Sequence, residues 1–132
     1  MKLQPDKTNT QVINGYGPGW VSVGSIVDGV PVLEKVSSSI VIGSRGERLD
    51  WTGIGFDQLS SALFDQLAQI KPELIVFGSG SKLRFPSPAL QRTLMAARIG
   101  LETMDTLAAC RTYNILAGED RHVLGVFLIK TI

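Results

Sequence analysis

A short apolar run near the middle of the chain constrains the fold most strongly. Residues Glu73–Phe77 form a nearly continuous apolar segment of strand length, and the segments around it carry apolar residues at helical spacing. A continuous apolar run suits a strand covered on both faces, because a strand that faces water alternates apolar and polar residues. With Leu101–Met104 as the next strand, Glu73–Met104 is expected to be a βαβ crossover with parallel strands. The sequence therefore predicts an α/β fold.

Three main helices are predicted in the second half from apolar spacing and from residues that favour helix ends. Each has a polar residue that can cap its first turn: Asp57, Ser87 and Asp105. The helices are expected to end near Ile70, Ile99 and Leu116. Helix-stopping residues follow these ends: Pro72, Gly100 and Gly118. A final strand is expected at His122–Lys130.

The first half holds short β-branched segments separated by glycine-containing turns, which is typical of a β-meander. Its strands are expected at Thr10–Asn14, Gly19–Val23, Ser25–Val27, Val30–Lys35, Ser39–Ile42 and Glu47–Trp51. Asp28 and Gly29 are a hairpin signal, because a type I′ turn needs positive φ at both central residues. Gly15–Gly19 and Gly43–Gly46 are predicted as further turns.

A single domain spanning residues 1–132 is the expected organisation, because a chain of this length can bury one hydrophobic core. Hydrophobic residues make up 44% of the chain, charged residues 19%, and the net charge is +1. So small a charge gives little repulsion between copies, and a homo-oligomer is compatible with the sequence. The same balance argues against nucleic acid as a partner, because phosphate-binding domains carry an excess of Lys and Arg.

Cysteine usage and the N-terminal sequence indicate a cytoplasmic protein. Cys110 is the single cysteine, so an internal disulfide cannot form and an oxidising compartment is not needed. The first residues contain no apolar segment of the kind that signal peptides carry. No apolar run approaches the length of a membrane span, so membrane insertion is not expected.

The best candidate site is the loop Gly78–Ser81 at the end of the predicted strand Glu73–Phe77. Ligands of α/β sheets bind beyond the carboxyl ends of parallel strands, so this loop and the segment Met104–Thr106 are expected to face one crevice. The stretch from residue 78 to 100 includes Arg84 and other basic residues but no acidic residue, so an anion could bind there. The alternative is that the small residues make room for a tight strand exit, with the basic residues as a solvated face.

A second polar group lies on the third predicted helix, at Arg111–Asn114. Successive polar residues cover all faces of a helix, so at least one is expected to face the sheet. Arg111 could form a structural ion pair with Asp105 or Glu102, or it could hold an anion over a strand end. The residues of the candidate pocket are Gly78, Ser79, Gly80, Ser81, Arg84, Asp105, Arg111, Thr112 and Asn114.

Residues suited to catalysis or metal binding are sparse. His122 is the single histidine, and Cys110 lies inside a predicted helix beside alanines that suggest packing. The carboxylates are spread along the chain, and no serine occupies a nucleophile elbow. No catalytic residue, metal site or cofactor is therefore predicted, and the sequence favours a protein that is not an enzyme.

Several segments together resemble the Mth-type domain family, which includes a mitochondrial respiratory complex I assembly factor and an adipogenesis-associated protein. The resemblance covers nearly the whole chain and is carried by Asn14–Gly17, Pro72–Gly80, Arg84–Pro86, Met104–Thr106, Ala108–Leu116 and Glu119–Arg121. It implies a three-layer β+α/β/α domain with a mixed central sheet. It also implies action through protein partners and no established catalytic residues.

Three functions remain open at this point. The leading hypothesis is a non-enzymatic protein-binding or assembly factor, with respiratory complexes as one possible target. The alternative is a small anion-binding protein, or an enzyme of unknown reaction, that uses the Gly78–Ser81 loop with Arg84 and Arg111. The third is a self-assembling structural domain.

Overall fold

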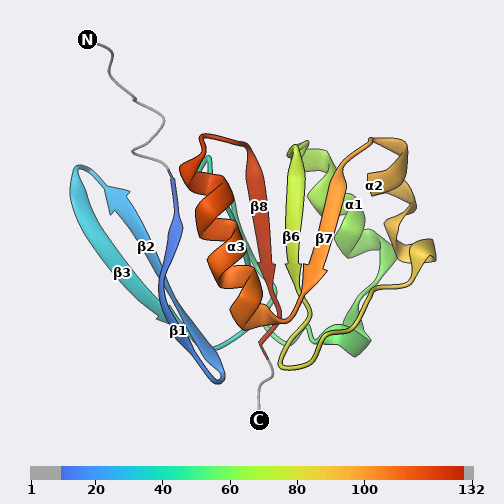
Figure 1. Cartoon of the computed structure of the whole chain (residues 1–132), viewed down its shortest axis with the longest axis horizontal. Coiled ribbons are helices and arrows are strands. Elements are labelled where there is room, and N and C mark those ends of the chain that lie inside the picture. Colours follow the sequence, from blue (N-terminus) through green and yellow to red (C-terminus); the bar gives the residue numbers. More distant parts are fainter. Residues whose placement is uncertain (1–9, 130–132) are drawn as a thin grey trace.

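The computed structural model describes residues 10–129 and arranges them in successive layers (Figure 1). A three-stranded sheet, ordered β1-β2-β3, packs on one side of helix α3, and a five-stranded sheet, ordered β5-β4-β8-β6-β7, packs on the other. Helices α1 and α2 cover the far face of the larger sheet. The strands are β1 (Val12–Gly17), β2 (Trp20–Val27), β3 (Val30–Val36), β4 (Ile40–Gly43), β5 (Arg48–Asp50), β6 (Leu74–Gly78), β7 (Gly100–Met104) and β8 (Val123–Phe127). The helices are α1 (Ser61–Ile70), α2 (Arg92–Ala96) and α3 (Thr106–Gly118).

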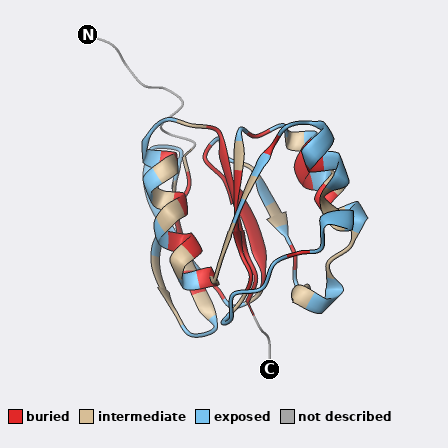
Figure 2. Cartoon of the chain, turned by 45° about the vertical axis from the view of Figure 1, so that its right-hand side comes forward, coloured by how far each residue is buried: buried red, intermediate tan, exposed pale blue. Residues whose placement is uncertain are grey.

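The larger sheet is mixed, as predicted. Strands β7, β6 and β8 are parallel, whereas β4 runs antiparallel to both β8 and β5. Strand β6 is buried along almost its whole length because helices lie over both faces of the sheet (Figure 2). This burial explains the continuous apolar run at residues 74–77, and the parallel pairing of β6 with β7 confirms the predicted crossover.

The predicted meander is divided between the two sheets: β1, β2 and β3 form a sheet of their own, whereas β4 and β5 belong to the central sheet. Asp28 and Gly29 have φ of 51° and 79°, which confirms the type I′ hairpin between β2 and β3. The turn predicted at residues 15–19 is present but shorter than predicted, because β1 continues to Gly17 and only residues 18 and 19 form the turn to β2. A Cβ at Gly17, the last residue of β1, would lie 2.7 Å from Nε1 of Trp20, so this glycine makes room for the indole. The two strands predicted at Gly19–Val23 and Ser25–Val27 are a single strand, because β2 runs unbroken through residue 24.

Helix α1 begins later than predicted. Asp57 is not its N-cap, because residues 56–58 form a separate 3₁₀ turn in which the Gln58 side chain accepts from the Gly55 N–H at 2.9 Å. The cap is Ser60, whose hydroxyl accepts from the Leu63 N–H at 3.4 Å. The helix ends before Pro72, as predicted.

The second helix is much shorter than predicted. Residues 88–91 form a 3₁₀ turn, the Ser87 side chain makes no capping hydrogen bond, and α2 ends at Ala96. The chain then turns at Arg98, which has a φ of 59°, and buries Ile99 against the sheet. Gly100, expected to stop the helix, is the first residue of β7.

Helix α3 matches the prediction at its start and extends to Gly118. The Asp105 carboxylate accepts from the Ala108 N–H at 2.9 Å and so caps the first turn. Because α3 lies between the two sheets, its buried residues pack in both directions: Ala109, Cys110, Tyr113 and Ala117. A helix covered on two sides need not show one simple apolar stripe.

Candidate functional site

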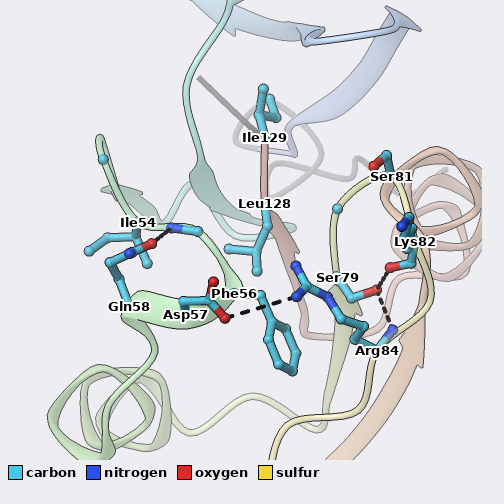
Figure 3. Close-up of a pocket in the computed structure, with 13 residues that line it drawn as sticks. Ile54, Phe56, Asp57, Gln58, Ser79, Ser81, Lys82, Arg84, Leu128 and Ile129 are labelled. Atoms are coloured by element: carbon cyan, nitrogen blue, oxygen red, sulfur yellow. Dashed lines mark hydrogen bonds and ion pairs between the residues drawn. The ribbon is translucent and has the colours of Figure 1, made fainter. Parts of the chain in front are cut away.

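The loop that follows β6 is organised around Ser79. The Ser79 hydroxyl donates to the Lys82 carbonyl at 2.6 Å and accepts from the Arg84 N–H at 3.0 Å (Figure 3). The Met104 carbonyl lies 3.2 Å from the same oxygen. Since Ser79 is almost fully buried, these bonds satisfy its hydroxyl inside the protein and fix the shape of the loop.

The two strand-end loops bond to each other directly. Gly80 donates its N–H to the Thr106 hydroxyl at 2.8 Å, and Thr106 donates its N–H to the Gly80 carbonyl at 2.9 Å. Ser79 donates its N–H to Met104 at 2.8 Å. A Cβ at Gly78 would lie 2.9 Å from the Thr106 Cα, so this glycine allows α3 to approach β6 closely. These contacts support the interpretation of the small residues as a tight strand exit.

A polar cavity of about 480 Å³ lies beside this loop. In the close-up, Arg84 extends across it between the Ser79 loop and the 3₁₀ turn (Figure 3). The guanidinium carbon lies 4.4 Å from the centre of the Phe56 ring, and Nη1 is 3.9 Å from Oδ1 of Asp57. The stacking and the ion pair hold Arg84 in place although it is exposed. The cavity is lined by Gly53, Ile54, Gly55, Phe56, Asp57, Gln58, Ser79, Gly80, Ser81, Lys82, Arg84, Leu128 and Ile129.

A second cavity of about 620 Å³ adjoins the first and is more apolar. Both are lined by Gly80, Ser81, Leu128 and Ile129, so they open on the same face. The second is further lined by Gly17, Pro18, Gly19, Trp20, Asp105, Thr106 and Leu107. We call the surface formed by the two cavities and the loop at residues 79–86 the carboxyl-end face.

Two exposed apolar side chains of this face were missed by the sequence analysis. Leu83 is 55% exposed and Phe85 is 70% exposed, although both are large and apolar. Their loop is fixed at one end by Ser79 and at the other by Gln91, whose amide donates to the Pro86 carbonyl at 2.9 Å. The available signal was an apolar residue at every second position, outside any expected helix or strand.

The predicted pocket residues do not all come together. Ser79, Gly80, Ser81 and Arg84 line the polar cavity, and Asp105 lines the apolar one. Gly78 lies behind them against α3. The remaining three, which line neither cavity, are Arg111, Thr112 and Asn114.

Arg111 and Asn114 contact β1 instead. Arg111 is exposed and donates to the Tyr16 hydroxyl at 3.2 Å, and in the part of the chain that the structure describes it forms no ion pair with Asp105 or Glu102. The Asn114 amide bonds to the backbone of Ile13.

The reactive side chains lie elsewhere. Nε2 of His122 is 2.5 Å from Oε2 of Glu47, a pair that joins residues distant in the sequence and that the sequence analysis missed. Cys110 is fully buried in α3, and burial raises the pKa of its thiol to about 12. Within residues 10–129, no three His, Cys, Asp or Glu side chains are grouped so that they could hold a metal ion. Nor does any helix in this range have the length and apolar character to cross a membrane.

The chain is similar in sequence and in structure to several bacterial proteins. A relative from Rhodobacter capsulatus, an uncharacterized protein, is 30% identical over 125 residues that cover 95% of this chain and 90% of the relative. A Bordetella pertussis protein described as a Mth938-like domain is 27% identical, with a TM-score of 0.75 over 98% of this chain and 92% of that one. A protein from Bartonella henselae described as an outer membrane protein is 25% identical, with a TM-score of 0.69 over 92% of this chain and 97% of that one.

The family model for proteins of unknown function DUF498/DUF598 matches residues 13–128, nearly the whole of the described structure. The architecture described above is also that of the Mth938-like domain, in agreement with the resemblance seen in the sequence. This chain therefore belongs to the DUF498/DUF598 family and has the Mth938-like fold.

Proposed function

We propose that this protein is a non-enzymatic protein-binding domain and that it binds its partner through the carboxyl-end face. The observation that carries the proposal is the exposure of Phe85 and Leu83 on a loop fixed by hydrogen bonds at both ends. A loop whose backbone is already fixed loses little conformational freedom on binding, and exposed aromatic side chains are enriched among the residues that dominate protein interfaces.

The surroundings of this loop support a protein partner. An apolar cavity and a polar cavity adjoin it, and Lys82 and Arg84 supply a charged rim. The Ser79 hydroxyl and the N–H groups of residues 79, 80 and 84 already have partners inside the protein. The loop therefore offers little hydrogen bonding to a small ligand and more contact area to a large one.

Substitution of Phe85 tests this proposal. We expect Phe85→Ser to lower the recovery of a specific partner about ten-fold in quantitative affinity purification at native expression. Ile115→Ser is the matched control, because Ile115 is 63% exposed on α3 and outside both cavities. A photo-reactive residue at position 85 should cross-link to the same partner. Equal recovery with both variants, or no partner with the unmodified protein, contradicts the proposal.

Assembly of respiratory complexes is the role that the family resemblance suggests for this binding. We expect a deletion strain to accumulate incompletely assembled complexes on native gels, and we expect wild type but not Phe85→Ser to restore them. The cytoplasmic location expected from the sequence is part of this proposal. Cell fractionation tests it directly, and recovery in a membrane fraction, which the description of the Bartonella henselae relative makes worth measuring, contradicts it.

The polar cavity favours a second candidate function, the binding of a small anion. Lys82 and Arg84 both line it, whereas Arg111 does not. A thermal-shift screen of phosphorylated and carboxylated metabolites distinguishes the two functions. Stabilisation that is lost in Arg84→Ala and kept in Arg111→Ala supports an anion site, and no shift at millimolar ligand removes it.

A further inference from the structure

The two outer edges of the three-stranded sheet differ in the hydrogen-bond partners of their backbone groups. At the β1 edge, Ile13 donates its N–H to Asn114 and accepts from the Asn114 amide at its carbonyl, both over 2.8 Å. The Gln11 carbonyl accepts from the Tyr113 hydroxyl at 2.7 Å. Helix α3 thus closes this edge with side chains. Strand β3 forms the other edge, at the outer margin of the molecule (Figure 1).

Among residues 10–129, the backbone of β3 has no partner at alternate residues on its outer edge. Val27 and Val30 flank the two-residue turn, and the closing pair of such a hairpin is hydrogen-bonded. Bonding alternates along an antiparallel ladder, so Pro31, Leu33 and Lys35 turn their backbone groups away from β2. The position of Pro31 agrees with this, because a proline has no N–H to contribute to the ladder.

The side chains of β3 are exposed and largely apolar. All its residues except Val36 are exposed, and Leu33 is 64% exposed. On the outer face, Leu33 and Val12 lie on either side of Gly24, since a Cβ there would be 3.4 Å from the first and 3.5 Å from the second. An open, apolar strand edge of this kind is a template for pairing with another strand.

We propose that a second copy of this chain pairs with β3, antiparallel, about a two-fold axis at Leu33. In this register each Leu33 exchanges both backbone hydrogen bonds with its counterpart, and each Lys35 N–H donates to the Pro31 carbonyl of the other copy. The two leucine side chains meet on the outer face. The two three-stranded sheets then form one continuous sheet.

Pairing about an axis at Leu33 is more favourable than pairing about an axis at either neighbouring residue. Pro31 leaves one carbonyl of each copy without a donor in either register, that of Lys35 with the axis at Leu33 and that of Leu33 with the axis at Val32. Between residues 31 and 35, however, the axis at Leu33 allows four backbone hydrogen bonds and the axis at Val32 only two. An axis at Glu34 sets two carboxylates directly opposite each other. In the Leu33 register, Glu34 faces Val32 of the other copy and keeps its bonds to Arg48, at 2.6 Å and 3.0 Å. The net charge of +1 adds little repulsion between copies.

Disulfide trapping tests the register. Leu33→Cys should form a covalent dimer under mild oxidation, because residues directly opposite in an antiparallel pair lie within disulfide reach. Lys35→Cys is the matched control on the same strand and face. Its own counterpart lies roughly 13 Å away in the proposed register, so it should not cross-link. The native Cys110 is buried and does not interfere.

Sedimentation equilibrium over a dilution series measures the association of the unmodified protein. We expect a monomer–dimer equilibrium whose dissociation constant rises about ten-fold in Leu33→Lys, which sets two ammonium groups at the axis. Ile115→Lys should leave it unchanged, with circular dichroism confirming that each variant folds. Phe85→Ser should also leave it unchanged, so this proposal stands or falls independently of the proposed function.

Three results overturn the proposal. The first is a monomer at millimolar concentration. The second is a dimer that Leu33→Lys does not weaken, and the third is cross-linking of Lys35→Cys in place of Leu33→Cys.

Discussion

The side-chain amide of Asn114 forms hydrogen bonds with both the N–H and the carbonyl of Ile13. Its Oδ1 accepts the Ile13 N–H and its Nδ2 donates to the Ile13 carbonyl, and each hydrogen bond is 2.8 Å long. Ile13 lies in β1, so this single side chain of α3 makes the two bonds that a neighbouring strand would otherwise make. The contact joins residues that are 101 positions apart and attaches the small sheet to the rest of the fold.

We expect Asn114→Ala to destabilise the protein by about 2 kcal/mol. The substitution removes both hydrogen bonds and leaves a partly buried N–H and carbonyl of Ile13 without partners. Urea denaturation measures the change in free energy of unfolding. Arg111→Ala, which removes one exposed bond from the same helix, is the control and should cost less than about 1 kcal/mol. Equal effects of the two variants would show that the Asn114 bonds contribute little.

Gly78 and Gly118 should respond oppositely to alanine. At Gly78 a Cβ would lie 2.9 Å from the Thr106 backbone, so α3 must shift, and we expect a loss of about 1–3 kcal/mol. At Gly118, the last residue of α3, nothing lies within 4 Å of the added Cβ. Alanine favours helix over glycine, so Gly118→Ala should be neutral or stabilising by up to about 1 kcal/mol. Thermal unfolding of both variants checks this, and a tolerant Gly78 would contradict the close approach of β6 and α3.

The Cys110 thiol should be unreactive in the folded protein. Burial raises the pKa of this thiol to about 12, so the reactive thiolate is scarce at neutral pH and the sulfur is also inaccessible. We expect a thiol reagent to label Cys110 only as fast as the protein unfolds, and to label it at once in denaturant. The thiol of Lys35→Cys, which is exposed and lies away from the proposed two-fold axis, provides the comparison in native buffer. Rapid labelling of the unmodified native protein would contradict the packing of α3.

The Glu34–Arg48 pair should make stability depend on acid pH. Hydrogen bonding to Arg48 lowers the pKa of the Glu34 carboxyl below its ordinary value of 4.5. Because the folded pKa is the lower one, the pair stabilises the protein above the ordinary value, and this stabilisation is lost as pH falls through the folded pKa. The pair is half-exposed, so its contribution at neutral pH should not exceed about 1 kcal/mol.

Unfolding of wild type and Glu34→Gln across the acid range measures this contribution. The difference between the two proteins should shrink towards zero in strong acid. In an Arg48→Gln background, Glu34→Gln should have little effect at any pH, and an unchanged difference there would assign the effect to another group.

Much of the fold was predictable because it depends on local patterns. The apolar run of β6, the capping Asp105 and the Asp28-Gly29 hairpin each act through neighbouring residues, and the structure confirms all three. The predicted length of the second helix was wrong because it depends on contacts that are distant in the sequence. Its apolar spacing continued to Ile99, but burial of that residue against the sheet required the chain to turn at Arg98 and leave the helix early.

The candidate site was less predictable than the fold. The sequence indicated the loop at residues 78–81 and Arg84, which do line one cavity or support it. The sequence analysis also assigned Arg111 and Asn114 to this pocket, because their helix begins close to the end of a strand. Their directions depend on the position of β1, which packs on α3 from the far end of the sequence.

The sequence by itself determined the α/β class, the parallel pairing of β6 with β7, and the family, because these depend on periodicity and on short local signals. Only the tertiary structure decided which polar groups remain free. The Ser79 hydroxyl, the loop N–H groups and Asn114 are all used inside the protein, whereas Phe85 and the β3 edge are left exposed. Hydrogen-bond partners distant in the sequence make this division, and a list of residue types does not contain them.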